Sequence, residues 1–253
     1  MSEVGQAVAA QRKVRASLFV TCLVDQFFPE VGEGVVKVLR GVGVEVDFPE
    51  AQTCCGQPAF NSGFHREALA VARNAVEAFR HSEYVIVPAG SCATMVKLFY
   101  PHLFRHDPPL QREVQALGQR TYEFSQFLVN VLGITDVGAS YQGRVTYHAS
   151  CHLLRELGVS QEPLALLRAV KGVKLAELPE AGACCGFGGT FAIKYPHISE
   201  AVLEDKLRNL ETTGAQVLVA GDMGCLMHIG GALSRRGSSV KVMHLAQLLA
   251  QEG

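Results

Sequence analysis

Short apolar segments alternate with amphipathic segments along the first part of the chain. Runs of apolar, mostly β-branched or aromatic residues predict buried strands at 17–21, 44–48 and 84–87. Apolar residues at helical spacing predict helices at 31–39, 62–80 and 123–131. Strands that alternate with helices are typical of an α/β fold with mainly parallel sheets.

The same order of elements returns in the second part of the chain. Strands are expected at 145–148, 173–175, 217–220 and 240–242. Helices are expected at 196–211, 222–230 and 244–250. The pattern therefore predicts two tandem α/β units.

Eight cysteines form two matching sets of four. We call Cys22, Cys54, Cys55 and Cys92 the first quartet. The second quartet consists of Cys151, Cys184, Cys185 and Cys225. Equivalent cysteines are 129, 130, 130 and 133 residues apart, and both Cys-Cys pairs are followed by glycine. The chain is therefore predicted to be a duplication with halves at 1–137 and 138–253.

Residues outside the cysteine frame repeat as well. The segment EFSQFL at 123–128 matches HLAQLL at 244–249, near the end of each half. Residues 133–143, rich in Gly, Ser and Asp, read as the joint between the halves.

Composition and net charge indicate which kinds of partner and which cellular compartment to expect. The 253 residues have a formal net charge of −1, so the chain lacks the excess of positive charge that is typical of nucleic-acid-binding proteins. No apolar run approaches the ~18 residues of a membrane span, and the N-terminal segment lacks the apolar core of a secretory signal. The cytoplasm is the expected location, where cysteines stay reduced.

Metal or cluster binding is the chemistry that the quartets favour. Cys22, Cys92, Cys151 and Cys225 each follow a predicted strand, so we expect each quartet to gather at one sheet edge. A disulfide between adjacent cysteines would require distorted geometry. Four thiolates suit zinc or an iron–sulfur cluster. The absence of the CxxC pairs usual in structural zinc sites favours the cluster, and zinc remains the alternative.

The doubled frame resembles the CCG cysteine-rich domain found in the superfamily of heterodisulfide reductase B-type subunits and, within it, the lactate utilization protein A family. The resemblance rests on CCGQPAFNSG at 54–63, CCGFGGTF at 184–191 and GDMGCLMHIG at 221–230. It implies an iron–sulfur protein that acts with sister subunits, including a ferredoxin-type iron–sulfur protein, in the oxidation of L-lactate.

The chain departs from the superfamily pattern at one position in each half. The superfamily's fifth cysteine is replaced by Met95 in the first half and by His228 in the second. Four cysteines per half suffice for an ordinary [4Fe–4S] cluster. Met95 is expected to be a core side chain, whereas His228 is a candidate ligand.

Other residues near the cysteines are candidates for supporting a bound centre. Gly56 and Gly186 allow a positive φ and bring a backbone N–H close to sulfur. His148 and His152 flank Cys151 and could donate hydrogen bonds to cluster sulfur. Lys194 could balance the charge of the centre, although a solvated lysine is the ordinary expectation.

The sequence thus predicts an electron-transfer subunit with one cysteine-ligated cluster per half, in a cytoplasmic complex that oxidises L-lactate or another 2-hydroxy acid. We expect a redox subunit that is not catalytic alone, and no catalytic residue is assigned. Two alternatives stay open: a zinc-stabilised interaction module, and a catalytic thiol/disulfide reductase subunit of the heterodisulfide reductase type.

Overall fold

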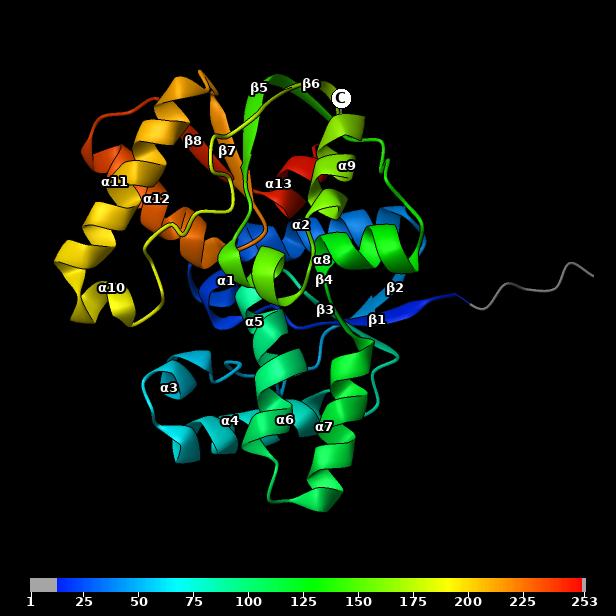
Figure 1. Cartoon of the computed structure of the whole chain (residues 1–253). Coiled ribbons are helices and arrows are strands. Elements are labelled where there is room, and N and C mark those ends of the chain that lie inside the picture. Colours follow the sequence, from blue (N-terminus) through cyan, green and yellow to red (C-terminus); the bar gives the residue numbers. More distant parts are fainter. Residues whose placement is uncertain (1–12, 252–253) are drawn as a thin grey trace, which may run out of the picture.

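The computed structural model describes residues 13–251 and contains two four-stranded parallel sheets (Figure 1). The first sheet has the order β2-β1-β3-β4 and consists of β1 Arg15–Leu18, β2 Glu45–Asp47, β3 Tyr84–Val87 and β4 Thr121–Glu123. The second has the order β6-β5-β7-β8 and consists of β5 Ser140–His148, β6 Lys171–Ala176, β7 Val217–Ala220 and β8 Lys241–His244. The prediction of an α/β fold with two duplicated parallel-sheet halves is confirmed.

The two middle strands of each sheet mark the place where a site is expected. Leu18 of β1 pairs with Ile86 of β3, and His148 of β5 pairs with Ala220 of β7. The chain order reverses between these neighbouring strands, so the loops that leave their carboxyl ends diverge and open a crevice.

The helices connect the strands on both sides of each sheet. The first half contains α1 Cys22–Phe27, α2 Pro29–Gly41, α3 Gln57–Asn61, α4 His65–Ala78, α5 Gly90–Thr94, α6 Tyr100–Leu103, α7 Pro108–Arg120 and α8 Phe124–Gln126, with π-helical turns η1 Met95–Phe99 and η2 Phe127–Val131. The second half contains η3 His152–Glu156, α9 Gln161–Ala169, α10 Phe191–Lys194, α11 Pro196–Thr212, α12 Met223–Arg235 and α13 Leu245–Leu249.

Some helices differ from the prediction. The helix expected at 62–80 is α4, which begins only at His65 because Gly63 just before it has a φ of +85°. The short helix α3, which ends at Asn61, was not predicted. The helices α7 and α9 were not predicted. Two prolines open α7, where the first turn tolerates them, and the Asp107 carboxylate accepts a hydrogen bond from the Leu110 N–H at 3.4 Å.

The last helix of each half packs against the other half. The C-terminal helix α13 lies against α2, and a Cβ on Gly34 would come within 3.0 Å of the Ala246 carbonyl oxygen. In the same way α8 and η2 contact α9 (Figure 1). One hydrophobic cluster therefore runs through both halves, from Val35 and Leu39 to Leu245 and Leu248.

Among residues 13–251, no helix is both long and apolar enough to cross a membrane. The N-terminal segment for which no secretory signal is expected lies largely outside the described residues, as do the outermost ends of the two predicted halves.

Candidate metal centre

The first quartet gathers from three segments at the carboxyl edge of the first sheet. Cys22 begins α1 directly after β1, Cys92 lies in α5 after β3, and the Cys54–Cys55 pair lies in the loop before α3. The Sγ atoms of Cys22 and Cys54 are 3.7 Å apart, and those of Cys55 and Cys92 are 3.3 Å apart. No disulfide joins any of them.

The second quartet repeats this arrangement at the edge of the second sheet. Cys151 directly precedes η3, Cys225 lies in the first turn of α12, and the Cys184–Cys185 pair lies in a loop before α10. In each half the second cysteine of the pair and the cysteine after the third strand are buried, while the other two are half-buried. The two quartets therefore present their sulfurs in the same way.

A glycine turn after each Cys-Cys pair directs a backbone donor at sulfur. Gly56 has a φ of +85° and its N–H lies 3.4 Å from the Cys54 Sγ; Gly186 has a φ of +89° and its N–H lies 3.3 Å from the Cys184 Sγ. A Cβ on Gly186 would come within 2.4 Å of the Ser199 carbonyl oxygen. Glycine is therefore required by conformation and by space at this turn.

The sulfurs influence one another's ionisation in both halves. Hydrogen bonds from Cys22, Cys55 and the Gly56 N–H lower the pKa of Cys54 to about 2, and the equivalent contacts lower the pKa of Cys184 to about 2. The hydrogen bond to Cys54 raises the pKa of Cys22 and of Cys55. The Cys54 thiolate is thus favoured in the first quartet, and a bound cation would be needed to ionise Cys22 and Cys55 as well.

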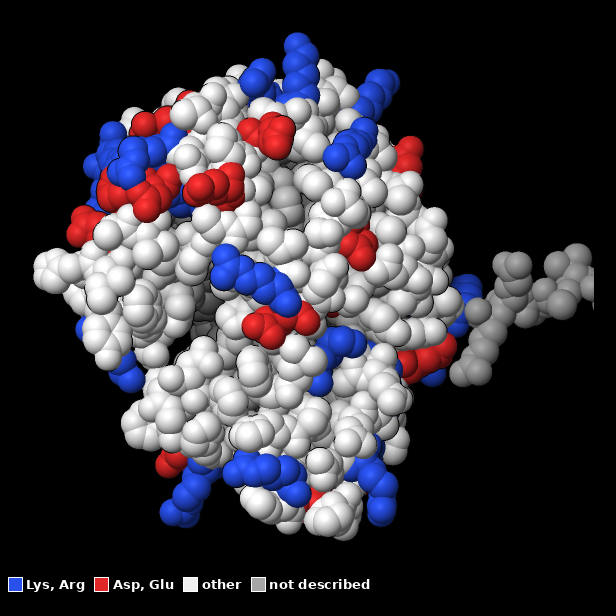
Figure 2. Space-filling model, viewed as in Figure 1, with Lys and Arg blue, Asp and Glu red and all other residues white. Residues whose placement is uncertain are grey.

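Both quartets face a single cavity of about 390 Å³. All eight cysteines line it, together with residues of α3, such as Pro58, and of α10, such as Ile193. The surface around α3 and α10 carries few charged side chains and is hollowed between them (Figure 2). The duplication therefore brings two four-sulfur sets to the wall of one mostly uncharged hollow.

Residues from the two halves meet beside the cysteines. The Ser91 N–H donates to the Asp222 carboxylate at 2.9 Å, and the Gly90 N–H donates to the Gly221 carbonyl at 3.3 Å. His152 reaches both sides of the cavity, with Nδ1 3.8 Å from the Cys151 Sγ and Nε2 3.5 Å from the Gln57 Nε2. These contacts fix the position of one quartet relative to the other.

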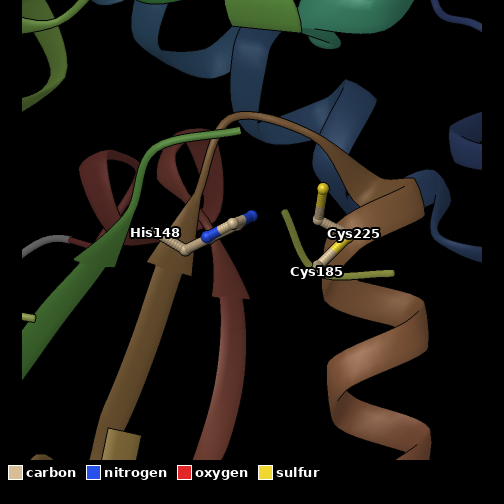
Figure 3. Close-up of side chains that lie close together, drawn as sticks. All are labelled: His148, Cys185 and Cys225. Atoms are coloured by element: carbon tan, nitrogen blue, oxygen red, sulfur yellow. The ribbon is translucent and has the colours of Figure 1, made fainter. Parts of the chain in front are cut away.

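His148 lies next to the sulfurs of the second quartet. One ring nitrogen and the Sγ atoms of Cys185 and Cys225 are all within 4.8 Å of one another, and the ring points toward the two sulfurs (Figure 3). Within the described part of the chain, neither ring nitrogen has a hydrogen-bond partner, although the side chain is buried. A buried imidazole without a partner and four unbridged thiols fit a metal or cluster, which would satisfy both.

The structure places the remaining candidates away from the cavity. His228 lies one turn after Cys225 on α12, but its Nε2 is 3.2 Å from the Ser199 Oγ and its ring lines a separate hollow. Met95 is fully buried in the core of the first half, and Lys194 is exposed.

Two buried charged residues near the site were missed by the sequence analysis. Lys206 of α11 is 1 % exposed and donates to the Glu180 and Ala181 carbonyls at 2.7 and 3.2 Å. Glu123 ends β4 and is fully buried. A lysine within an amphipathic helix gives no sequence signal of burial. The match of Glu123 to His244 in the repeat indicated the duplication but not the burial of either side chain.

Comparison with known proteins agrees with the doubled frame. The CCG cysteine-rich domain family matches the chain twice, over residues 16–97 and 145–230. A solved hypothetical protein from Helicobacter pylori has a similar fold, with a TM-score of 0.63 and 12 % identity over 93 % of this chain and 48 % of that protein.

Curated relatives match over nearly their whole length. Lactate utilization protein A of Geobacillus thermodenitrificans is 51 % identical, covering 93 % of this chain and 98 % of that protein. The protein of the same name from Oceanobacillus iheyensis is also 51 % identical, with 93 % and 96 % covered. From the two domain matches and these identities, the chain belongs to the lactate utilization protein A family of CCG cysteine-rich domain proteins.

Proposed function

We propose that this chain is an iron–sulfur electron-transfer subunit of an L-lactate-oxidising system and holds one cysteine-ligated cluster in each half. The names of its relatives support the link to lactate utilization. Iron–sulfur clusters supply one-electron transfer when they are bound by such cysteines. The chain would act with sister subunits, including a ferredoxin-type iron–sulfur protein, in the cytoplasm.

The convergence of two equivalent cysteine quartets on one cavity carries this proposal. In each half the Cys-Cys pair and two further cysteines supply four sulfurs, enough for a [4Fe–4S] cluster. The N–H groups of Gly56 and Gly186 already point at sulfur and would stabilise negative charge there. Because both quartets line the same cavity, electrons could pass from one half to the other within the chain.

The mouth of this cavity offers a surface for a redox partner. Ile193 lines the cavity and is 82 % exposed, and Tyr195 and Ile198 beside it are also exposed. Exposed apolar groups at a site's rim are typical of protein interfaces. The proposed ferredoxin-type subunit would cover this rim and exchange electrons with the nearer centre.

A zinc-stabilised module is the second candidate, and the sulfur spacing favours it. Four thiolates around one tetrahedral zinc, with Zn–S bonds of about 2.3 Å, lie about 3.8 Å apart. The 3.7 Å between the Cys22 and Cys54 sulfurs is close to that value. Such a protein would be colourless and would give no reducible signal.

Metal analysis of protein purified without oxygen separates the two candidates. We expect iron and acid-labile sulfide in equal amounts, about four of each per quartet, with a visible spectrum that bleaches on reduction. One zinc per quartet with neither iron nor sulfide would reject the iron–sulfur proposal. Oxygen must be excluded throughout, because centres exposed at a sheet edge are lost in air.

A further inference from the structure

The surroundings of the two quartets differ in polarity. His148 lies three residues before Cys151, and Phe19 lies three residues before Cys22. The Ser199 carbonyl faces the Gly186 turn, and the Ala68 carbonyl faces the Gly56 turn in the same way, so Ser199 and Ala68 are equivalent. Seven residues further along the chain, the second half has Lys206 and the first half has Ala75. All four are buried, so the second half has an imidazole and a cation where the first has a phenyl ring and a methyl group.

Lys206 lies beside the second quartet. Its Nζ donates to the Glu180 and Ala181 carbonyls, in the loop that leads to Cys184. Burial lowers the pKa of Lys206, and attraction to the sulfurs of Cys185 and Cys225 offsets part of that shift. A buried cation is screened little by water, so its attraction for negative charge on these sulfurs is strong.

His148 places an imidazole beside the same sulfurs. One ring nitrogen and the Sγ atoms of Cys185 and Cys225 all lie within 4.8 Å of one another, and the ring points toward the two sulfurs (Figure 3). The side chain is buried, so water screens the ring dipole little and it acts strongly on charge at these sulfurs.

Within residues 13–251, the first quartet has no equivalent of these two side chains. Phe19 packs against Phe79 with ring centroids 4.9 Å apart. The first half does contain a part-buried lysine, Lys97, which donates to the Gly118 and Thr121 carbonyls at 2.8 Å each. It lies over the ring of Tyr122 on β4, and no cysteine affects its pKa.

A buried carboxylate, that of Asp222, lies between the two quartets. Asp222 accepts from the Ser91 N–H, next to Cys92, at 2.9 Å and from the Gly224 N–H, next to Cys225, at 3.0 Å. Its negative charge raises the pKa of Cys225 and so opposes Lys206 at the second quartet, although the two N–H groups that donate to the carboxylate reduce this effect.

We propose that the two quartets hold redox centres of unequal reduction potential, and that the second-half centre is the more readily reduced because Lys206 and His148 lie beside its sulfurs. This inference rests on the proposed function. Reduction adds one electron to a centre, and a nearby cation and a polar imidazole beside the sulfurs stabilise the added charge. A single electron placed on the first-half centre would pass to the second-half centre, with no bond formed or broken.

The test is an anaerobic redox titration of the full chain, followed by electron paramagnetic resonance. Cys55→Ser and Cys185→Ser identify which signal belongs to which half. Lys206→Met removes the cation, His148→Phe reproduces the first-half residue, and Lys97→Met is the matched control with the same pair of carbonyl acceptors. Iron and sulfide content is measured for every variant, so that loss of a centre is separated from a change in its potential.

We expect the signal lost in Cys185→Ser to be reduced first in the unmodified protein. Lys206→Met should shift its reduction equilibrium about tenfold toward the oxidised state, about 59 mV for one electron. Lys97→Met should shift neither signal.

Equal or reversed potentials in the unmodified protein would overturn the inference, as would an unchanged second-half potential in both Lys206→Met and His148→Phe. If Lys206→Met fails to retain iron, the reduction potentials of His148→Phe and of the unmodified protein decide whether the inference holds. An absence of iron and sulfide in the unmodified protein would reject the proposed function as well.

Discussion

Glu123 and His244 occupy equivalent positions in the two halves, and each caps the helix that follows its strand. Glu123 ends β4 and its carboxylate accepts from the Ser125 and Gln126 N–H groups at 2.8 and 3.1 Å. His244 ends β8, and its Nδ1 accepts from the Ala246 N–H at 3.1 Å. Both are fully buried. Burial raises the pKa of Glu123 to about 7 and lowers the pKa of His244 to about 4.

The Glu123 carboxyl should make stability depend on pH. Between its ordinary value of 4.5 and about 7, the folded state binds more protons than the unfolded state, so the free energy of unfolding falls as pH rises. The total change is about 3 kcal/mol. Glu123→Gln keeps an acceptor for the cap and removes the titration. Urea unfolding from pH 4.5 to 7.5 should show the variant gaining stability relative to the unmodified protein as pH rises.

The difference in stability between the unmodified protein and Glu123→Gln reports the titration of Glu123 alone. His148 and His244, with a pKa of about 4 when folded, contribute a change of the opposite sign between about pH 4 and 6.5, but they do so equally in both proteins. Parallel stability curves would show that Glu123 does not titrate in this range.

Loss of one cysteine from a Cys-Cys pair should affect only its own half. Cys55→Ser and Cys185→Ser each remove a buried sulfur from one quartet. Each variant should retain about half of the iron and sulfide of the unmodified protein, because the other four-cysteine site is intact. Full metal content in both variants would show that the pairs are not ligands.

The glycine turn at Gly186 should tolerate no side chain. Gly186→Ala would combine a positive φ with a contact of 2.4 Å to the Ser199 carbonyl oxygen. The control is Gly158→Ala, where φ is +69° but no atom lies within 4 Å of the added Cβ. The control should lose about 1–2 kcal/mol of stability. Gly186→Ala should lose more and also bind less iron, as measured by urea unfolding and metal analysis; equal losses would mean that space at the turn is unimportant.

His228 should not be a ligand in this fold. Its Nε2 lies next to the Ser199 Oγ, which itself donates to the Gly186 carbonyl at 2.8 Å. His228→Gln keeps a polar partner for Ser199 and should leave the iron content and the spectrum of the second-half centre unchanged. A changed spectrum at full iron content would restore His228 to the ligand set.

The exposed rim of the cavity should matter for binding a partner. Ile193→Asp places a charge on a side chain that is 82 % exposed, so folding and metal content should be unaffected. Affinity for the purified ferredoxin-type subunit should fall about tenfold, or 1.4 kcal/mol. Binding can be followed by calorimetry, with Phe64→Asp as a control at an exposed residue that does not line the cavity. Equal effects of the two changes would place the interface elsewhere.

The sequence alone indicated the duplication, the parallel sheets and the convergence of cysteines at strand ends. These features depend on local patterns: apolar runs such as 217–220, and cysteines that directly follow them. The cavity shared by the two quartets could not be predicted from the sequence, because the relative placement of the halves depends on which helix covers which apolar face. The burial of Lys206 was equally hidden, since its two carbonyl partners lie about 25 residues away in the chain.

The exchange of terminal helices has a consequence for the history of the chain. The helix α13 of the second copy packs on α2 of the first, and α8 of the first copy packs on α9 of the second. Each copy alone would therefore expose apolar surface that the other copy covers. An ancestral single-copy protein with this architecture would have closed the same surfaces by pairing with itself. With both copies in one chain, equivalent positions can carry different residues, as Phe19 and His148 do.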